Sequence, residues 1–251
     1  MPQPAAELTQ RTLPLLGPEA MERLACSHVM VVGIGGVGAY AAEMLARTAV
    51  GHITLIDGDC VAPSNLNRQL PALLSTLGRP KAEVMAERIA SINPAALVDT
   101  VRRFLMPGEA GALLQETTPD FVIDAIDSIQ PKVDLITACL RSGTGIISSM
   151  GAGGRTDPMR IKYADIAETS YDGLAREIRR RLRRDHGIYS GLPVVCSTEQ
   201  PRRASLVMTD EIAFKTSSYG TVAWIPAQFG MMAAAYAIEK IITNDNGKRY
   251  S

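Results

Sequence analysis

The stretch that decides the fold is Gly33-Ile34-Gly35-Gly36-Val37-Gly38, a glycine-rich turn. It follows the apolar run Val29–Gly33, which predicts a strand, and leads into Val37–Arg47, which predicts a helix. In such a unit the glycines allow the tight turn, let backbone approach a phosphate and let the helix pack on the strand. Free N–H groups at the start of the helix favour an anion there. The stretch therefore predicts a nucleotide site.

Strand-like and helix-like stretches alternate along the first part of the chain. The expected strands are Ile53–Asp57, Val98–Phe104, Phe121–Asp124 and Gly145–Ser149, and the expected helices are Lys81–Ser91, Pro107–Glu116 and Lys132–Arg141. Near-continuous apolar strands are typical of a sheet that is covered on both faces. The alternation predicts an α/β fold, a Rossmann-like, doubly wound, mostly parallel sheet with helices on both faces.

The pattern changes after Gly151-Ala152-Gly153-Gly154. Beyond it we expect strands at Met159–Tyr163, Pro193–Ser197 and Ser205–Thr209, a basic helix at Leu174–Arg184 and a final helix at about Ala227–Ile242. There is neither an internal repeat nor a low-complexity linker. We therefore expect one domain over residues 1–251, in which a smaller α+β half, about 151–251, packs on a nucleotide-binding half, about 1–150.

The composition argues against a membrane protein and against a zinc-stabilised domain. Polar and charged residues interrupt the most apolar segment, Trp224–Ile242, so a buried helix is favoured over a membrane span. No signal peptide pattern is visible at the N-terminus. The cysteines are Cys26, Cys60, Cys139 and Cys196, which form no C-x-x-C pair and no disulfide framework. A cytoplasmic protein without structural zinc is expected.

An acid at the end of the second expected strand completes a nucleotide-binding unit. Asp57 stands at the distance from Gly38 where a carboxylate usually holds ribose hydroxyls. This unit fits a nicotinamide or flavin dinucleotide as well as ATP. An NAD-dependent oxidoreductase is therefore one alternative, and glycines that serve only packing are another.

A polar and cationic cluster follows that strand. Asn65, Arg68, Gln69 and Lys81 are expected at the carboxyl edge of the sheet, where ligands bind in such folds. A reaction at the α-phosphate of ATP must stabilise a departing pyrophosphate, and fixed Arg and Lys side chains suit that charge. The alternative is a set of solvated surface charges. An oxidoreductase leaves Arg68 and Lys81 without a role.

Two carboxylates are expected at the same edge. Asp124 ends the strand Phe121–Asp124, and Asp127 follows it directly. A carboxylate there can hold magnesium against phosphates, because Mg²⁺ requires oxygen ligands. Alternatively, Asp127 or Ser128 caps the next helix, and a capping role does not exclude metal contact.

With these residues assembled, the chain resembles the adenylating family (ThiF/MoeB/HesA) that includes the ubiquitin-activating enzymes and the bacterial thiamine and molybdopterin synthase adenylyltransferases. The matching elements are Gly33–Gly38, Asp57-Gly58-Asp59, Asn65-Leu66-Asn67-Arg68-Gln69, Lys81 and Asp124-Ala125-Ile126-Asp127. In that family a carboxylate attacks the α-phosphate of ATP, and an acyl-adenylate forms.

The resemblance implies roles for individual residues. The implied ATP site consists of Gly33, Gly35, Gly36, Gly38, Asp57, Asp59, Asn65, Arg68, Gln69, Lys81, Asp124 and Asp127. In it Arg68 and Lys81 neutralise phosphates, Asp57 holds the ribose, and Asp127 manages magnesium. Arg11 resembles the family's N-terminal arginine, which acts in the active site of the partner subunit of a homodimer. The catalytic set implied is therefore Arg68, Lys81, Asp127 and Arg11.

Within the family, the chain is most similar to the tRNA threonylcarbamoyladenosine dehydratases. The narrower markers are Ile92-Asn93-Pro94, Val122–Ser128, Gly151–Gly154, Cys196-Ser197-Thr198-Glu199 and the Gly230 region. This implies tRNA carrying threonylcarbamoyladenosine as substrate, cyclised with ATP and magnesium and releasing AMP and pyrophosphate. Sulfur-mobilising partner proteins remain open.

Two departures bear on the alternatives. An adenylyltransferase for the C-terminus of a ubiquitin-like or sulfur-carrier protein would often carry zinc-binding C-x-x-C pairs, which are missing here. Cys196 stands where the subgroup has a phenylalanine, so no catalytic thiol is carried over. We expect Cys196 to be a small core residue.

A tRNA substrate requires a local basic surface, because 26 Lys and Arg balance 26 Asp and Glu. Leu174–Arg184 supplies it: Arg176, Arg180, Arg183 and Arg184 recur at helical spacing and form the expected tRNA-binding face. An ordinary solvated helix is the alternative.

Overall fold

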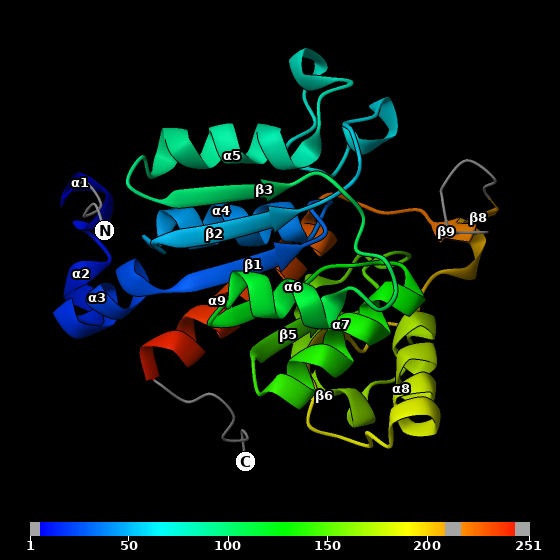
Figure 1. Ribbon diagram of the computed structural model, residues 1–251. Helices are drawn as coiled ribbons and strands as arrows, with labels where there is room; N and C mark the ends of the chain where they lie inside the picture. Colours follow the sequence, from blue (N-terminus) through cyan, green and yellow to red (C-terminus); the bar gives the residue numbers. More distant parts are fainter. Residues whose placement is uncertain (1–5, 209–216, 244–251) are drawn as a thin grey trace.

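A seven-stranded sheet forms the centre of the computed structural model, which describes residues 6–208 and 217–243 (Figure 1). Its strands are β1 (His28–Val32), β2 (His52–Ile56), β3 (Leu97–Val101), β4 (Phe121–Asp124), β5 (Gly145–Ser149), β6 (Ile161–Asp165) and β7 (Pro193–Ser197). Their order is β3-β2-β1-β4-β5-β7-β6, and only the edge strand β6 runs antiparallel to its neighbour. The sheet is therefore mostly parallel, with the strand order of a Rossmann fold in its first half.

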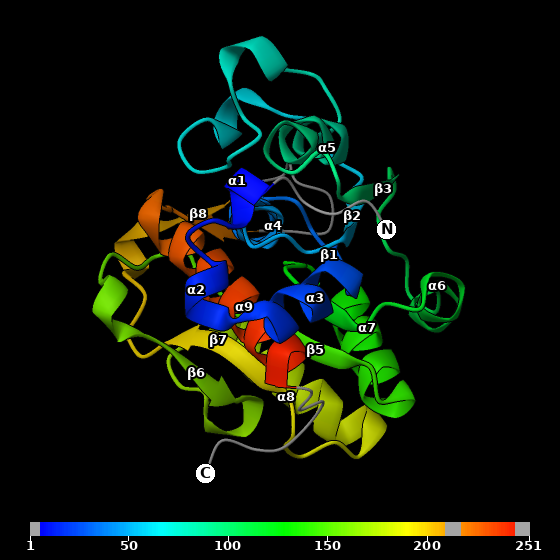
Figure 2. The same ribbon diagram turned by 90° about the vertical axis from the view of Figure 1, so that its left-hand side faces the viewer.

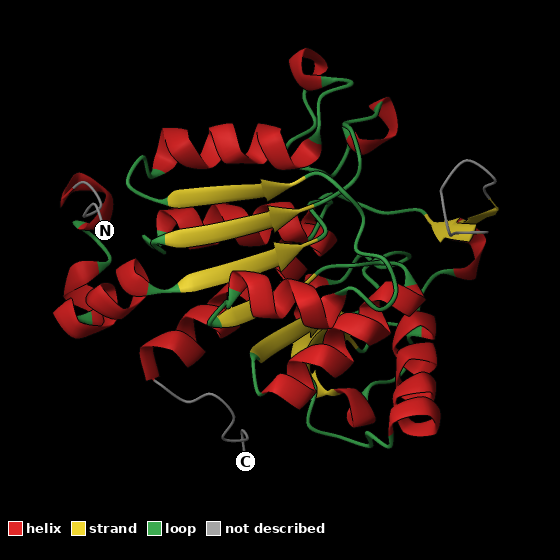
Figure 3. Ribbon diagram, viewed as in Figure 1, coloured by secondary structure: helices red, strands yellow, loops and turns green. Residues whose placement is uncertain are grey.

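Helices cover both faces of this sheet (Figure 2). The helices of the described residues are α1 (Ala6–Thr9), α2 (Leu13–Leu16), α3 (Pro18–Cys26), α4 (Gly38–Arg47), α5 (Lys81–Ile92), α6 (Ala110–Thr117), α7 (Ile129–Ser142), α8 (Gly173–His186) and α9 (Trp224–Thr243), of which α1 and α2 stand at one end of the sheet (Figure 1). A separate pair of antiparallel strands, β8 (Leu206–Met208) and β9 (Ser217–Tyr219), projects beyond the carboxyl ends of the central strands (Figure 3).

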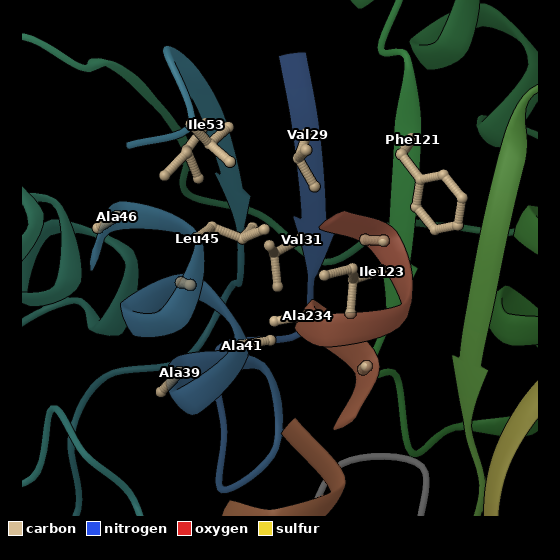
Figure 4. Packing of buried hydrophobic residues seen from close by; sticks show 14 of the residues in the cluster. Val29, Val31, Ala39, Ala41, Leu45, Ala46, Ile53, Phe121, Ile123 and Ala234 are labelled. Carbon is tan, nitrogen blue, oxygen red and sulfur yellow. The ribbon is translucent and has the colours of Figure 1, made fainter. Parts of the chain in front are cut away.

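Alternate side chains of the central strands enter two different cores. Val29 and Val31 of β1 pack with α4 and α9, whereas Met30 and Val32 pack with α6, α7 and α8. Figure 4 shows the first of these cores, where Val31 and Ile123 lie beside Ala41 and Ala234 of the two helices. Because both of their faces are buried, β1 and β4 consist almost entirely of apolar residues.

The last helix closes the fold against the first half of the chain. At the crossing of α4 and α9, a Cβ on Gly230 would overlap the carbonyl oxygen of Val37 and would lie 3.0 Å from the Cβ of Tyr40. Only glycine lets the two backbones approach this closely. The C-terminal helix therefore packs directly against the first turn of α4.

The expected fold class is confirmed. The strands β4, β5 and β7 have the predicted bounds, while the helix expected at Pro107–Glu116 begins only at Ala110. Helices α1 to α3 were not predicted. Thr209, the last residue of one expected strand, lies outside the described residues. In the described part of the chain no helix is long and apolar enough to span a membrane.

Candidate functional site

The glycine turn lies where β1 meets α4, at the carboxyl edge of the sheet. Gly33 has a φ of 92°, and its N–H donates to the carbonyl of Ile56 at 2.8 Å. A Cβ at Gly33 would lie 2.7 Å from the carbonyl oxygen of Ala125, and one at Gly38 would overlap the carbonyl oxygen of Gly33. Gly33 is thus wedged between β2 and the segment that follows β4, and neither Gly33 nor Gly38 has room for a side chain.

Asp57 holds the glycine turn from the neighbouring strand end. Its carboxylate accepts the N–H of Ile34 at 2.6 Å and that of Asp59 at 2.7 Å. Burial raises the pKa of Asp57 above its usual value, and the nearby Lys81 opposes this rise. The carboxylate therefore fixes the turn in shape, whereas ribose binding stays a prediction.

Lys81 is placed at the edge by a pairing of two backbone segments. Its N–H donates to the carbonyl of Asp59 at 3.0 Å, and its ammonium lies 2.8 Å from the Asp59 carboxylate. The Lys81 side chain is buried while Asp59 is exposed. The Lys81 ammonium is thus held in a fixed position by Asp59 at the carboxyl edge of the sheet.

The segment between Asp59 and Lys81 brings an amide against the glycine turn. Asn65 accepts the N–H of Ala62 at 3.0 Å through its side chain and that of Gln69 at 2.9 Å through its carbonyl. Gln69 in turn faces Gly35, since a Cβ there would lie 3.8 Å from its amide nitrogen. The Gln69 Oε1 atom is buried without a hydrogen-bond donor among the described residues. A buried polar atom of this kind indicates a place for a ligand donor.

Arg68 and Asp127 meet on the open side of this edge. The Arg68 guanidinium donates to the carbonyl of Ser64 at 2.8 Å and to the side chain of Asn67 at 2.9 Å. Partial burial lowers the pKa of Arg68, and the negative charge of Asp127 opposes that shift. Asp127 is exposed directly after β4. A cation and a carboxylate are thus presented together beside the glycine turn.

Asp124, in contrast, lies inside the protein. It has no exposed surface and accepts the Ser148 hydroxyl at 2.7 Å, the Ile126 N–H at 3.0 Å and the Lys132 ammonium at 2.9 Å. Lys132 is equally buried and also donates to the carbonyl of Ile126 at 2.9 Å. These protein donors occupy the carboxylate of Asp124, so its geometry favours a structural role over the expected contact with ATP.

A second polar network lies on the side of β5 and β7. Arg155 is buried and donates to the carbonyls of Gly151, Glu199 and Tyr171. Asp172 accepts the N–H of Gly151 at 2.9 Å and that of Ala175 at 2.9 Å, and thereby caps α8. The expected marker Gly151–Gly154 is thus joined to the start of the arginine helix.

Helix α8 presents its arginines to solvent beside this network. Arg176, Arg179, Arg180, Arg183, Arg184 and Tyr189 line a surface hollow of about 470 Å³. Arg180 pairs with Glu177 at 2.6 Å, and Arg184 donates to Asp185 at 2.7 Å. No ion pair involves Arg176 or Arg183 within the described residues. Arg176, Arg180, Arg183 and Arg184 therefore lie on one face of α8, as expected. Acidic neighbours partly neutralise the charges of Arg180 and Arg184.

Arg11 is not part of this constellation. It lies between α1 and α2, and these helices stand at the end of the sheet opposite the strand arrowheads in Figure 1. Arg11 is exposed there, at the end of the sheet away from the glycine turn of its own chain (Figure 1).

Comparison with known proteins gives this arrangement a family. A model of the ThiF family matches residues 8–250. The chain belongs to the ThiF family. The resemblance inferred from the motifs is therefore confirmed, and the family match spans both halves of the chain.

The similar proteins differ in how much of the chain they cover. A tRNA threonylcarbamoyladenosine dehydratase of Escherichia coli is 40% identical and covers 92% of each chain. The crystal structure of the E. coli dehydratase in complex with ATP has a TM-score of 0.87 at 39% identity and covers 95% of each chain. A molybdopterin-synthase adenylyltransferase of E. coli is 35% identical but covers only 52% of this chain and 51% of its own.

Several polar residues of this ThiF-family site were missed from the sequence. Lys132, Arg155 and Asp172 act through contacts with other elements of the fold, and no local motif marks them. The one signal available for Asp172 is its position before a helix, where an acid is a common cap. Cys196 is buried in the second core, where burial raises the pKa of its thiol, so its expected role as a core residue is confirmed.

Proposed function

We propose that this ThiF-family chain is an ATP-dependent dehydratase that cyclises threonylcarbamoyladenosine in tRNA. The observation that carries the proposal is the extent of similarity. The similarity to the named dehydratases runs through both halves of the chain, whereas that to the adenylyltransferase covers about half. A likeness over nearly the whole chain favours a dehydratase of tRNA over an adenylyltransferase of a carrier protein.

The nucleotide edge fits ATP in shape and charge. Glycines in such a turn let backbone N–H groups approach phosphates. The buried Gln69 Oε1 has no hydrogen-bond donor among the described residues, and a ligand could supply one. Arg68 and Lys81 are positioned cations. Magnesium, when bound, supplies charge neutralisation at the phosphates, and Asp127 would hold it together with phosphate oxygens and water. Among the described side chains no cluster of three or more His, Cys, Asp and Glu residues could hold a metal.

The chemistry requires activation of a carboxylate that is already ionised at neutral pH. A carboxylate oxygen of the threonyl group attacks the α-phosphorus, and the bond to pyrophosphate breaks. Arg68 and Lys81 stabilise the charge that develops on the leaving group. The carbamoyl group then attacks the activated carbonyl carbon, AMP leaves, and the nucleoside has lost one water. No protein thiol is needed.

Two further parts complete the proposal. We assign tRNA binding to the exposed arginines of α8, because an arginine surface complements phosphates. We also assign Arg11 to the active site of a second subunit, because α1 and α2 stand at the opposite end of the sheet from their own site. The nucleotide half, about 1–150, and the substrate and dimer half, about 151–251, then act as one unit. Sulfur-mobilising partners are optional, and the four free cysteines suit a reducing cytoplasm.

The test is incubation of the protein with ATP, magnesium and tRNA that carries the modification. Loss of one water mass from the nucleoside, with release of AMP, is expected. If the mass stays the same and pyrophosphate exchange requires a carrier protein, the chain is instead an adenylyltransferase. Asp127→Ala should abolish the reaction while α7 still folds, and full turnover by this variant contradicts the role given to Asp127.

A further inference from the structure

Tyr171 combines an exposed ring with an unusual backbone. Its φ is 53°, in the left-handed region that bulky residues rarely adopt, and 61% of its surface is exposed. Among the described residues only Ala49, Thr118 and Tyr171 have a positive φ without being glycine. This conformation of an aromatic residue costs folding free energy, and the exposed ring gains no burial that would offset it.

Buried contacts on both sides hold this conformation. The Arg155 guanidinium, which belongs to a residue only 3% exposed, donates to the Tyr171 carbonyl at 3.0 Å. The next residue, Asp172, caps α8 and accepts the Gly151 N–H at the carboxyl end of β5. The backbone of Tyr171 is therefore fixed between the sheet edge and the arginine helix, and the ring is held out in solvent.

The charged hollow of α8 lies next along the chain. Arg179, one of its lining residues, donates to the carbonyl of Thr169 at 3.1 Å and ties the hollow to the segment that leads into Tyr171. Arg176 and Arg183 enter no ion pair among the described residues, and Tyr189 adds a second ring that is 66% exposed. This surface offers phosphate ligands and aromatic faces together.

We propose that Tyr171 stacks on an unpaired base of an RNA loop whose phosphates lie along Arg176 and Arg183. Arginines beside an exposed ring are the usual means of binding single-stranded RNA, because every base has a face that can stack. Six arginines in Leu174–Arg184 of a chain with zero net charge favour a polyanion over a neutral protein surface. The inference rests on the proposed function, and it names where the anticodon loop would dock.

The experiment separates stacking from phosphate binding. Tyr171→Gly removes the ring and relieves the backbone strain, whereas Tyr171→Phe keeps the ring. Affinity is measured for an anticodon stem-loop RNA and for a duplex RNA of equal length, in which no base is free to stack. We expect Tyr171→Gly to weaken loop binding about tenfold and to leave duplex binding unchanged. Arg176→Gln combined with Arg183→Gln should weaken both.

Thr118→Gly is the matched control, because Thr118 has a φ of 45° at the opposite end of the sheet, just before β4. It should keep wild-type affinity, and in both glycine variants the Tm should not fall. A fluorescent adenine analogue in the loop should be quenched by wild type and Tyr171→Phe but not by Tyr171→Gly. Equal loop affinity of wild type and Tyr171→Gly, or an equal loss for both RNAs, overturns the proposal.

The failure of this inference can be told from failure of the proposed function. If wild type dehydrates modified tRNA and Tyr171→Gly does so with an unchanged KM for tRNA, only the stacking role is lost. If wild type binds loop RNA through Tyr171 but releases no water from the nucleoside, the stacking role stands and the dehydratase assignment fails.

Discussion

The nucleotide edge and the surface of α8 both present positive groups to an anion, but the two are built in opposite ways. At the edge, the glycine turn touches Asp57 and Ala125 from two neighbouring segments, and the Lys81 ammonium is held by the Asp59 carboxylate across the chain. On α8, the arginines lie at the surface, and Arg180, Arg181 and Arg184 pair with acids of the same helix. The first region depends on contacts between distant segments, and the second depends on local charge.

This difference determines how each region should respond to substitution. A buried network loses its geometry when one member is removed, because the remaining polar groups cannot be resolvated. A row of exposed charges changes by small, nearly additive steps that salt screens. Substitutions in both regions test this contrast, beginning with the largest expected effect.

The largest effect is expected at Lys132. Lys132→Met leaves the fully buried Asp124 carboxylate without its cation, and breaking such a pair costs about 3–5 kcal/mol. Thermal unfolding should show a Tm lower by on the order of 10 °C. Lys162→Met makes the same change at an exposed position of β6 and should shift the Tm little.

A companion variant tests the cause of that loss. Asp124→Asn combined with Lys132→Met removes both charges and keeps an oxygen that can accept the Ile126 N–H. It should recover part of the stability lost in Lys132→Met. A double variant that is as unstable as the sum of its single changes would contradict the idea of an unpaired buried charge.

The next effect is expected where α9 supports the nucleotide edge. Gly230→Ala forces apart two helices whose backbones are in contact, and overpacking of this kind costs about 1–3 kcal/mol. The KM for ATP should rise along with the loss in Tm, because α4 begins at the glycine turn.

Gly111→Ala supplies the control with the opposite sign. Gly111 lies in α6, and a Cβ there meets nothing within 4 Å. Alanine should stabilise this helix by about 0.5–1 kcal/mol. If both Gly230→Ala and Gly111→Ala lowered the Tm, close helix packing at Gly230 would not explain the loss of stability there.

The same contrast explains how much the sequence could reveal. The strands β4, β5 and β7 were predicted with their bounds, because short apolar runs between turn residues indicate buried strands. The helices α1 to α3 were missed, since short segments held by packing carry little periodicity of their own. Pro107 and Gly108 delayed the start of α6 to Ala110.

The candidate site divides along the same line. Arg68, Lys81 and the glycine turn could be placed at one edge, because the carboxyl ends of parallel strands meet there. That Asp124 is inside while Asp127 is outside could not be predicted, because it depends on Lys132 and Ser148 from other segments. The conformation of Tyr171 likewise depends on Arg155, which lies 16 residues earlier in the sequence.

A smaller effect is expected within the arginine surface. Arg176→Gln with Arg183→Gln removes charges that have no acidic partner among the described residues, whereas Arg180 and Arg184 are partly neutralised by Glu177 and Asp185. In a titration of RNA affinity against salt, removing one arginine–phosphate interaction should reduce the slope by about one. The first pair of substitutions should therefore lower the slope more than Arg180→Gln with Arg184→Gln, and neither should change ATP affinity. Equal slopes for the two double variants would show that ion pairs within α8 do not change how strongly its arginines contribute to RNA binding.

The smallest effect concerns the local pairs themselves. Hydrogen bonds from Arg180 and Arg181 lower the pKa of Glu177 to about 2. In the unfolded chain this carboxylate titrates at about 4.3, so between these two values of pH the unfolded state holds a proton that the folded state lacks. The pairs therefore stabilise the fold above about pH 4.5, and this contribution is lost as the pH falls towards 2. Because the groups are exposed to solvent, this contribution should amount to less than about 1 kcal/mol at neutral pH.

Comparing Tm values of wild type and Glu177→Gln from pH 7 to pH 3 isolates the contribution of Glu177 from that of other carboxylates. The difference in Tm between the two proteins should be small at pH 7, and it should decrease in acid and in high salt. A difference of several degrees that does not depend on salt would show that α8 behaves like the buried edge.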